Sequence, residues 1–144
     1  MHLELATQVA LIAAGWIFVW GLLLGVWKFA QIAVSPDGCA HVYVDIAHRA
    51  ALMYSFATLL LAALVQFSAW PTWVNVAALA VVIVFFAGAI ASYCVHGWRQ
   101  DTTNQYHPRD AGLVAATVAL IVGEVGGTVV ILAGFIVEQS RTWT

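Results

Sequence analysis

Charge is scarce in this chain. Of its 144 residues, 5 are Lys or Arg and 7 are Asp or Glu, so 8% are charged and the formal net charge is −2. A soluble domain has about 25% charged residues. No basic excess is available to neutralise a phosphate backbone, so nucleic acid is not an expected partner. Disorder is excluded as well, because 63% of the residues are hydrophobic.

Cysteine and the short motifs of soluble enzymes are also nearly absent. The two cysteines, Cys39 and Cys94, cannot form a disulfide framework, and we expect both to be free thiols. The sequence has no Gly-rich phosphate loop, no C-x-x-C and no H-E-x-x-H. Any chemistry must therefore come from isolated polar side chains.

Long apolar runs dominate what is present. A helix needs about 20 apolar residues to cross a bilayer, and four runs are long enough. They predict helices at about 5–33, 46–70, 73–96 and 113–137. Membrane strands alternate in polarity, which these runs do not. We therefore expect one domain, residues 1–144, that is all-α and an integral membrane antiparallel four-helix bundle. The first run lacks a basic start, which favours a retained helix over a cleaved signal peptide.

The positive charges predict the orientation. Lys28, Arg49, Arg99 and Arg109 belong to the long connections and their flanks, whereas Arg141 is alone on the other side. By the positive-inside rule, we expect the long connections to face the cytoplasm and both termini to face outward. We expect the membrane to be a bacterial inner membrane.

Tryptophan is expected at the headgroup level of both membrane surfaces. Trp27 and Trp98 fall on one side, and Trp70, Trp73 and Trp143 on the other. Two further tryptophans, at positions 16 and 20, are deeper and are expected to pack inside the bundle.

Histidines concentrate on the side of the long connections. His48 opens the second predicted helix, and Tyr93 and His96 end the third. The antiparallel topology brings these ends to one depth, so a pocket bordered by these three side chains is a hypothesis. The alternative is that His48 and Arg49 only anchor a helix start, with Asp45 as its N-cap.

Glu124 is the one acid expected deep in the membrane. It lies eleven residues past Leu113, which is about 16 Å along a helix. A lone acid there is expected to carry a proton unless it is paired. The candidate partners are Thr58, Trp16 and Trp20. Either a structural tie between helices or a proton relay or pocket wall would explain Glu124.

Small residues predict one close helix crossing. Gly21 and Gly25 form a small-xxx-small pattern in the first run, which supports close packing within or between protomers.

The second and third runs resemble a known family. The segment Ile46-Ala47-His48-Arg49-Ala50-Ala51-Leu52-Met53-Tyr54 is followed by Ser92-Tyr93, with Tyr93 45 residues after His48. Together with chain length and helix count, this resembles the small four-helix membrane proteins of the styrene oxide isomerase and hydroxylaminobenzene mutase family.

The resemblance implies an activity and a cofactor. His48 would be the iron ligand of haem b, whose ferric iron acts as a Lewis acid in rearranging an epoxide to a carbonyl compound. Tyr93 would be a substrate-side hydroxyl, and Tyr54 occupies a substrate-contact position where the family has asparagine. Arg49 and His96 would lie behind these groups. The family also implies a homotrimer and a small hydrophobic substrate.

Non-enzymatic functions form the alternative. A small membrane subunit needs no cofactor. A haem protein of electron transfer or sensing usually fills both axial positions of the iron, for which His96 or His41 are candidates.

Overall fold

The computed structural model describes residues 2–142, and this part of the chain is built from four helices without strands. Their order is α1 (Leu5–Val34), α2 (Val42–Gln66), α3 (Thr72–Arg99) and α4 (Ala111–Thr142). All four are long and apolar enough to cross a membrane. The protein is therefore a multi-pass integral membrane protein, and the predicted all-α four-helix fold is confirmed.

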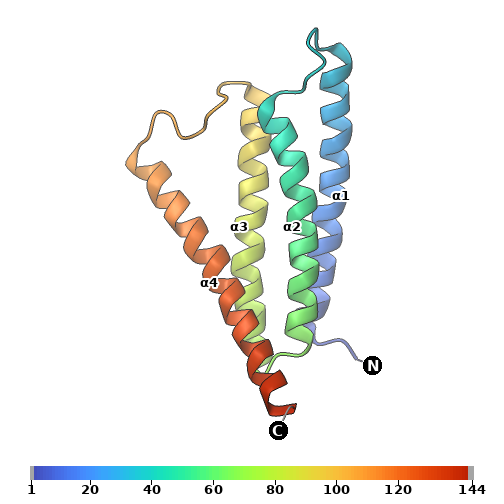
Figure 1. Cartoon of the computed structure of the whole chain (residues 1–144), viewed down its shortest axis with the longest axis vertical. Helices are drawn as coiled ribbons and strands as arrows, with labels where there is room; N and C mark the ends of the chain where they lie inside the picture. Colours follow the sequence, from blue (N-terminus) through green and yellow to red (C-terminus); the bar gives the residue numbers. More distant parts are fainter. Residues whose placement is uncertain (1, 143–144) are drawn as a thin grey trace.

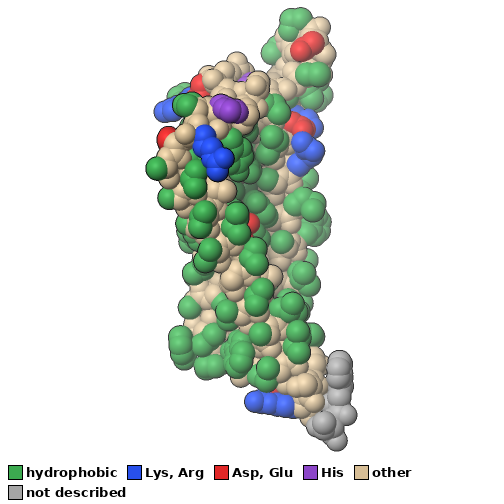
Figure 2. Space-filling model, turned by 60° about the vertical axis from the view of Figure 1, so that its left-hand side comes forward, with side chains coloured by type: hydrophobic (Ala, Val, Ile, Leu, Met, Phe, Trp, Pro, Cys, Tyr) green, Lys and Arg blue, Asp and Glu red, His purple; other side chains and the backbone are tan. Residues whose placement is uncertain are grey.

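The helices run antiparallel, and the two longer connections lie at one end of the molecule (Figure 1). The N-terminal and C-terminal ends lie together at the opposite end. Figure 2 shows hydrophobic side chains over the body of the molecule, with charged and histidine side chains mainly toward its two ends. This distribution fits a chain whose middle lies in hydrocarbon and whose ends lie in water.

Helix α2 is displaced from its predicted range by four residues at both ends. It begins at Val42 because His41 caps it, with the His41 Nδ1 accepting the Tyr43 N–H at 3.3 Å. Asp45 is thus not the N-cap. It lies in the first turn and pairs with Lys28 at 2.5 Å and with Arg49 at 2.8 Å. These ion pairs join α1 to α2 at the end of the long connections.

Two apolar clusters hold α1, α2 and α3 together. The cluster near the chain termini joins Ala10, Leu61 and Leu79, and Ile131 of α4 belongs to it as well. The cluster near the long connections joins residues of α1, α2 and α3 only: Ile17, Leu24, Ala47, Ala51 and Ile90. Helix α4 is therefore absent from the second cluster, and Figure 1 shows it leaning away from α3 toward that end.

Helix α4 is fastened to the bundle along its C-terminal half. A Cβ on Gly123 would lie 2.2 Å from the Phe85 ring, and one on Gly127 would lie 2.5 Å from Val82. Further along, the Trp70 Nε1–H donates to the Val130 carbonyl at 2.8 Å. Because glycine has no side chain, α4 and α3 can approach closely at these positions. Toward the long connections, α4 diverges from α3.

The tryptophans agree in part with the prediction of interfacial rings. Trp73 and Trp98 are exposed at opposite ends of α3, as expected, whereas Trp143 lies outside the described residues. Trp20 packs against the second cluster. Trp16 does not pack inside the bundle, because it is 71% exposed on the outer face of α1.

Candidate functional site

His48 lies at the crossing of α1 and α2. Its Nδ1 is 2.8 Å from the carbonyl oxygen of Gly21. A carbonyl can only accept, so Nδ1 must carry the hydrogen and Nε2 the free lone pair. The ring lies against Gly25, where a Cβ would come within 2.9 Å of the His48 Cε1. The Gly21 to Gly25 pattern therefore serves a crossing within one chain, and it seats this imidazole.

Of the two ring nitrogens of His48, Nε2 is the one that bears on metal binding. Nε2 has no hydrogen-bond partner among residues 2–142, and it is not an enclosed atom. An imidazole whose Nδ1–H is held by a carbonyl has a fixed tautomer and ring orientation, which is the usual arrangement of a histidine that binds a metal through Nε2. The side chain is half-buried, and Nε2 lies 3.6 Å from where a Cβ on Gly25 of α1 would be.

A cavity of about 360 Å³ lies where α4 diverges from α3. Its polar groups come from all sides of the cavity: Tyr54 of α2, Ser92, Tyr93 and His96 of α3, Thr117 of α4, and Gln105 and Tyr106 of the connection above. The rest of its lining is mainly apolar and comes from α3 and α4: Phe85, Gly88, Ala89, Leu113, Ala116, Ala119 and Leu120. This volume is within the range of small-molecule sites.

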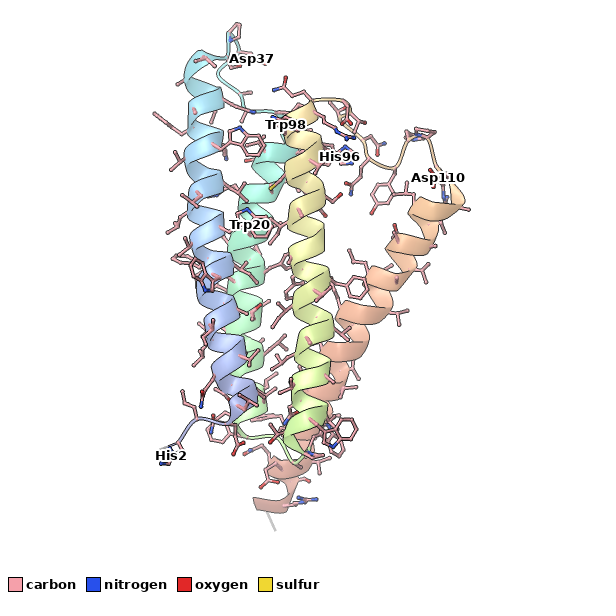
Figure 3. All side chains as sticks on the ribbon, turned by 180° about the vertical axis from the view of Figure 1, so that it is seen from behind. His2, Trp20, Asp37, His96, Trp98 and Asp110 are labelled. Atoms are coloured by element: carbon pink, nitrogen blue, oxygen red, sulfur yellow. The ribbon has the colours of Figure 1, made fainter. Side chains whose placement is uncertain are left out.

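The connection between α3 and α4, residues 100–110, covers the mouth of this cavity. His96 lies on the side of α3 that faces this connection (Figure 3), and its Nδ1 is 2.9 Å from the Asp101 carboxylate. The hydrogen bond with His96 lowers the pKa of Asp101 below its ordinary value of 3.8. The Tyr43 hydroxyl accepts the Gln105 N–H at 2.6 Å. The connection is thus tied to both α2 and α3, as a cap rather than a free loop.

Tyr43 also connects the capping residues to the cavity. Its ring stacks on Tyr93, with centroids 6.1 Å apart, and contacts His96 at 5.3 Å. Deeper in the cavity wall, Tyr54 stacks on Phe86 with centroids 4.0 Å apart. The phenols at positions 54 and 93 are therefore held by ring contacts, and Tyr93 also interacts with the Gln105 side chain.

Glu124 lies one helical turn beyond the cavity-lining Leu120 and is not itself one of the lining residues. It follows Leu120 and Thr117 on the same face of α4, and both of these line the cavity. It is near enough to Tyr54 and Tyr93 to interact with both electrostatically. Its Oε1 is enclosed, and no hydrogen bond joins Glu124 to another residue of the described chain.

None of the three partners predicted for Glu124 is bonded to it. Thr58 is fully buried but donates its hydroxyl to the Tyr54 carbonyl at 2.7 Å. Trp16 faces outward, and Trp20 belongs to the cluster of α1, α2 and α3. Glu124 is therefore not a hydrogen-bonded tie between helices.

The predicted site residues divide between two places. Tyr54, Tyr93 and His96 share the cavity between α3 and α4, whereas His48 is not among its lining residues and faces α1. The single pocket expected around His48, Tyr93 and His96 is therefore wrong. Arg49, the residue after His48, is exposed and pairs with Asp45 one turn earlier on α2.

Two features of the site were missed by the sequence interpretation. Tyr43 was assigned to a connection because the start of α2 was placed at residue 46, although a tyrosine one residue inside an apolar run is a usable signal. Gln105 and Tyr106 gave no signal, because they belong to a polar stretch without periodicity. Within residues 2–142, no group of three or more His, Cys, Asp or Glu side chains is placed to hold a bare metal ion. Cys39 is exposed and Cys94 half-buried, and both are free.

Comparison of the chain with models of known families, with curated proteins and with solved structures finds no match.

Proposed function

We propose that this protein is a haem-dependent membrane isomerase that converts a small hydrophobic epoxide to a carbonyl compound, as the resemblance of its second and third helices implies. The observation that supports this proposal is the His48 imidazole, with Nδ1 held by the Gly21 carbonyl and Nε2 free. A single histidine suffices as the proximal ligand of a haem.

The residues around His48 fit such a group. The glycines of α1 leave room for the ring, and the carbonyl bond to Nδ1 leaves Nε2 as the ring nitrogen without a partner. Lys28 and Arg49 lie at the same end of the helix pair, where they would be near the carboxylates of a macrocycle. When bound, ferric haem supplies a Lewis acid that polarises an epoxide oxygen.

The substrate-side groups belong to the cavity between α3 and α4. Tyr93 and Tyr54 each offer a hydroxyl for a hydrogen bond to the substrate oxygen, and His96 lies behind Tyr93 near the cap. The remaining wall is mainly apolar and suits a hydrocarbon substrate. Water must be kept out because it would turn an epoxide into a diol, and the capping residues 100–110 serve this purpose.

This chemistry requires His48 and the cavity between α3 and α4 to be close together. His48 and the two phenols face different sides of one chain, so we propose a homo-oligomer, a trimer by the resemblance. In this assembly His48 of one protomer would serve the cavity of its neighbour. We further propose that the membrane is a bacterial inner membrane, with the long connections in the cytoplasm.

Absorption spectroscopy of the detergent-purified, haem-loaded protein tests the proposal. We expect a Soret band of a five-coordinate ferric haem in the wild-type protein and its loss in His48→Ala, with exposed His2→Ala as a control that keeps it. Conversion of an aryl epoxide to an aldehyde should follow the same pattern. No Soret band after haem loading, or a band unchanged by His48→Ala, would overturn the assignment. A low-spin spectrum with two protein ligands would favour electron transfer instead.

A further inference from the structure

A pocket of about 410 Å³ lies where the connection of residues 100–110 meets the start of α4. It adjoins the cavity between α3 and α4, and we call it the α4 pocket. The connection contributes polar side chains to it and the helix mainly apolar ones: Tyr106, His107 and Arg109 from the first, and Leu113, Val114, Thr117 and Val118 from the second. The α4 pocket therefore has a polar end toward the connection and an apolar part along the helix.

Arg109 gives this pocket a positive charge. Among the described residues that line the α4 pocket, it is the only charged one. Its guanidinium is exposed and has no ion pair or hydrogen bond with a side chain of residues 2–142. The next residue, Asp110, caps α4 instead, with its Oδ1 accepting the Leu113 N–H at 2.7 Å. The charge of Arg109 is thus available to an anionic ligand.

The polar end has the donors that a phosphate group requires. A guanidinium binds phosphate oxygens through two parallel N–H bonds. The His107 ring and the Tyr106 hydroxyl can each donate a further hydrogen bond. Figure 2 views the molecule from the α4 side and shows basic and histidine side chains close together at this end, above hydrophobic ones. A phosphate bound here would lie at the boundary between water and hydrocarbon.

An apolar groove continues from the α4 pocket along the helix. Val114, Val118 and Val122 recur every four residues on one face of α4, and all three are exposed. Together with small alanines they line a groove of about 800 Å³ that includes Arg109 at its end. The three valines span about 12 Å of helix. A soluble phosphate compound would leave this groove unused, whereas an acyl chain would cover it.

We propose that the α4 pocket and its groove bind one anionic phospholipid. Its phosphate binds Arg109 and His107, and one acyl chain lies along Val114, Val118 and Val122. Because the only charge of the pocket is positive, a lipid of net negative charge is favoured over a zwitterionic one. The inference rests on the surface of α4 and not on haem, so it stands or falls independently of the proposed isomerase.

Native mass spectrometry of the delipidated, full-length protein in detergent tests this with two lipids. Dioleoylphosphatidylglycerol and dioleoylphosphatidylcholine have the same acyl chains and differ in net charge. We expect the wild-type protein to bind one phosphatidylglycerol about fivefold more tightly than phosphatidylcholine. Arg109→Gln should lose this preference. Arg99→Gln removes the same charge at the same end of the molecule, outside the pocket, and should keep it.

A second measurement uses the wild-type protein alone. A ligand that binds the folded state raises the unfolding temperature, so phosphatidylglycerol should raise it more than phosphatidylcholine, and high salt should narrow the difference. Glycerol phosphate, which has no acyl chain, should not displace the lipid. Equal binding of the two lipids would overturn the proposal, as would a preference retained in Arg109→Gln, displacement by glycerol phosphate, or an oligomer that covers this surface and binds neither lipid.

Discussion

The contact between His48 and α1 is the most constrained feature at the level of single side chains. The ring is held on one edge by the Gly21 carbonyl and lies against the open space at Gly25. Any side chain at Gly25 must compete with the imidazole for that space. The position of Nε2 therefore depends on the absence of a side chain at Gly25 as well as on the Gly21 carbonyl.

Gly25→Ala tests this dependence. A Cβ there would lie 2.9 Å from the His48 Cε1, so the ring must move, and overpacking of this kind costs about 1–3 kcal/mol. We expect lower thermal stability in detergent and a weaker or shifted Soret band. Gly15→Ala, on the same helix with open space at its Cβ, is the control and should leave both unchanged. Equal behaviour of the two variants would contradict the proposed seating of His48.

Sequence reasoning found His48 and the two glycines but did not connect them. A ring on α2 meets a glycine on α1 only in one register of the two helices, and the register depends on the packing of Leu24, Ala47 and Ala51. The pattern of a single helix does not contain that information. The same limit explains why His48 was expected to share a pocket with Tyr93.

The helices themselves were largely predictable, because an apolar run must form a helix in a membrane to satisfy its backbone hydrogen bonds. Their ends were less so. The start of α2 depends on the His41 cap, which no apolar pattern marks. The divergence of α4 from α3 was not predictable either, since it depends on which glycines of α4 meet α3.

Gly123→Ala tests the close packing of α4 on α3. Its Cβ would lie 2.2 Å from the Phe85 ring, whereas Gly126 has open space. We expect Gly123→Ala to destabilise the fold by about 1–3 kcal/mol and to widen the cavity end near Glu124. Gly126→Ala, three residues away, should behave as the wild type. Thermal unfolding in detergent compares them, and equal stabilities would show that α4 does not pack on α3 at Gly123.

The molecule as a whole separates its charged groups from its hydrocarbon-facing surface, and this supports a definite orientation in the membrane. Four of the five basic residues belong to the end with the long connections. The exposed Cys39 lies in the first of these connections, between α1 and α2. It therefore reports which side of the membrane this end occupies.

Thiol labelling tests the orientation. A membrane-impermeant maleimide should label Cys39 in inside-out vesicles and not in intact cells, since this end is proposed to be cytoplasmic. Cys39→Ser should abolish the signal, because Cys94 is half-buried within α3. Labelling of intact cells alone would reverse the proposed orientation.

The uneven attachment of α4 has a consequence for biogenesis. Helices α1 to α3 share both apolar clusters and leave the ribosome first, whereas α4 adds only Ile131 to one of them. The first three helices can therefore assemble in the bilayer before α4 is synthesised, and α4 then docks through the segment from Gly123 onward. The cavity between α3 and α4 and the cap above it form only once α4 has been synthesised, so a nascent chain can hold three packed helices before this cavity exists.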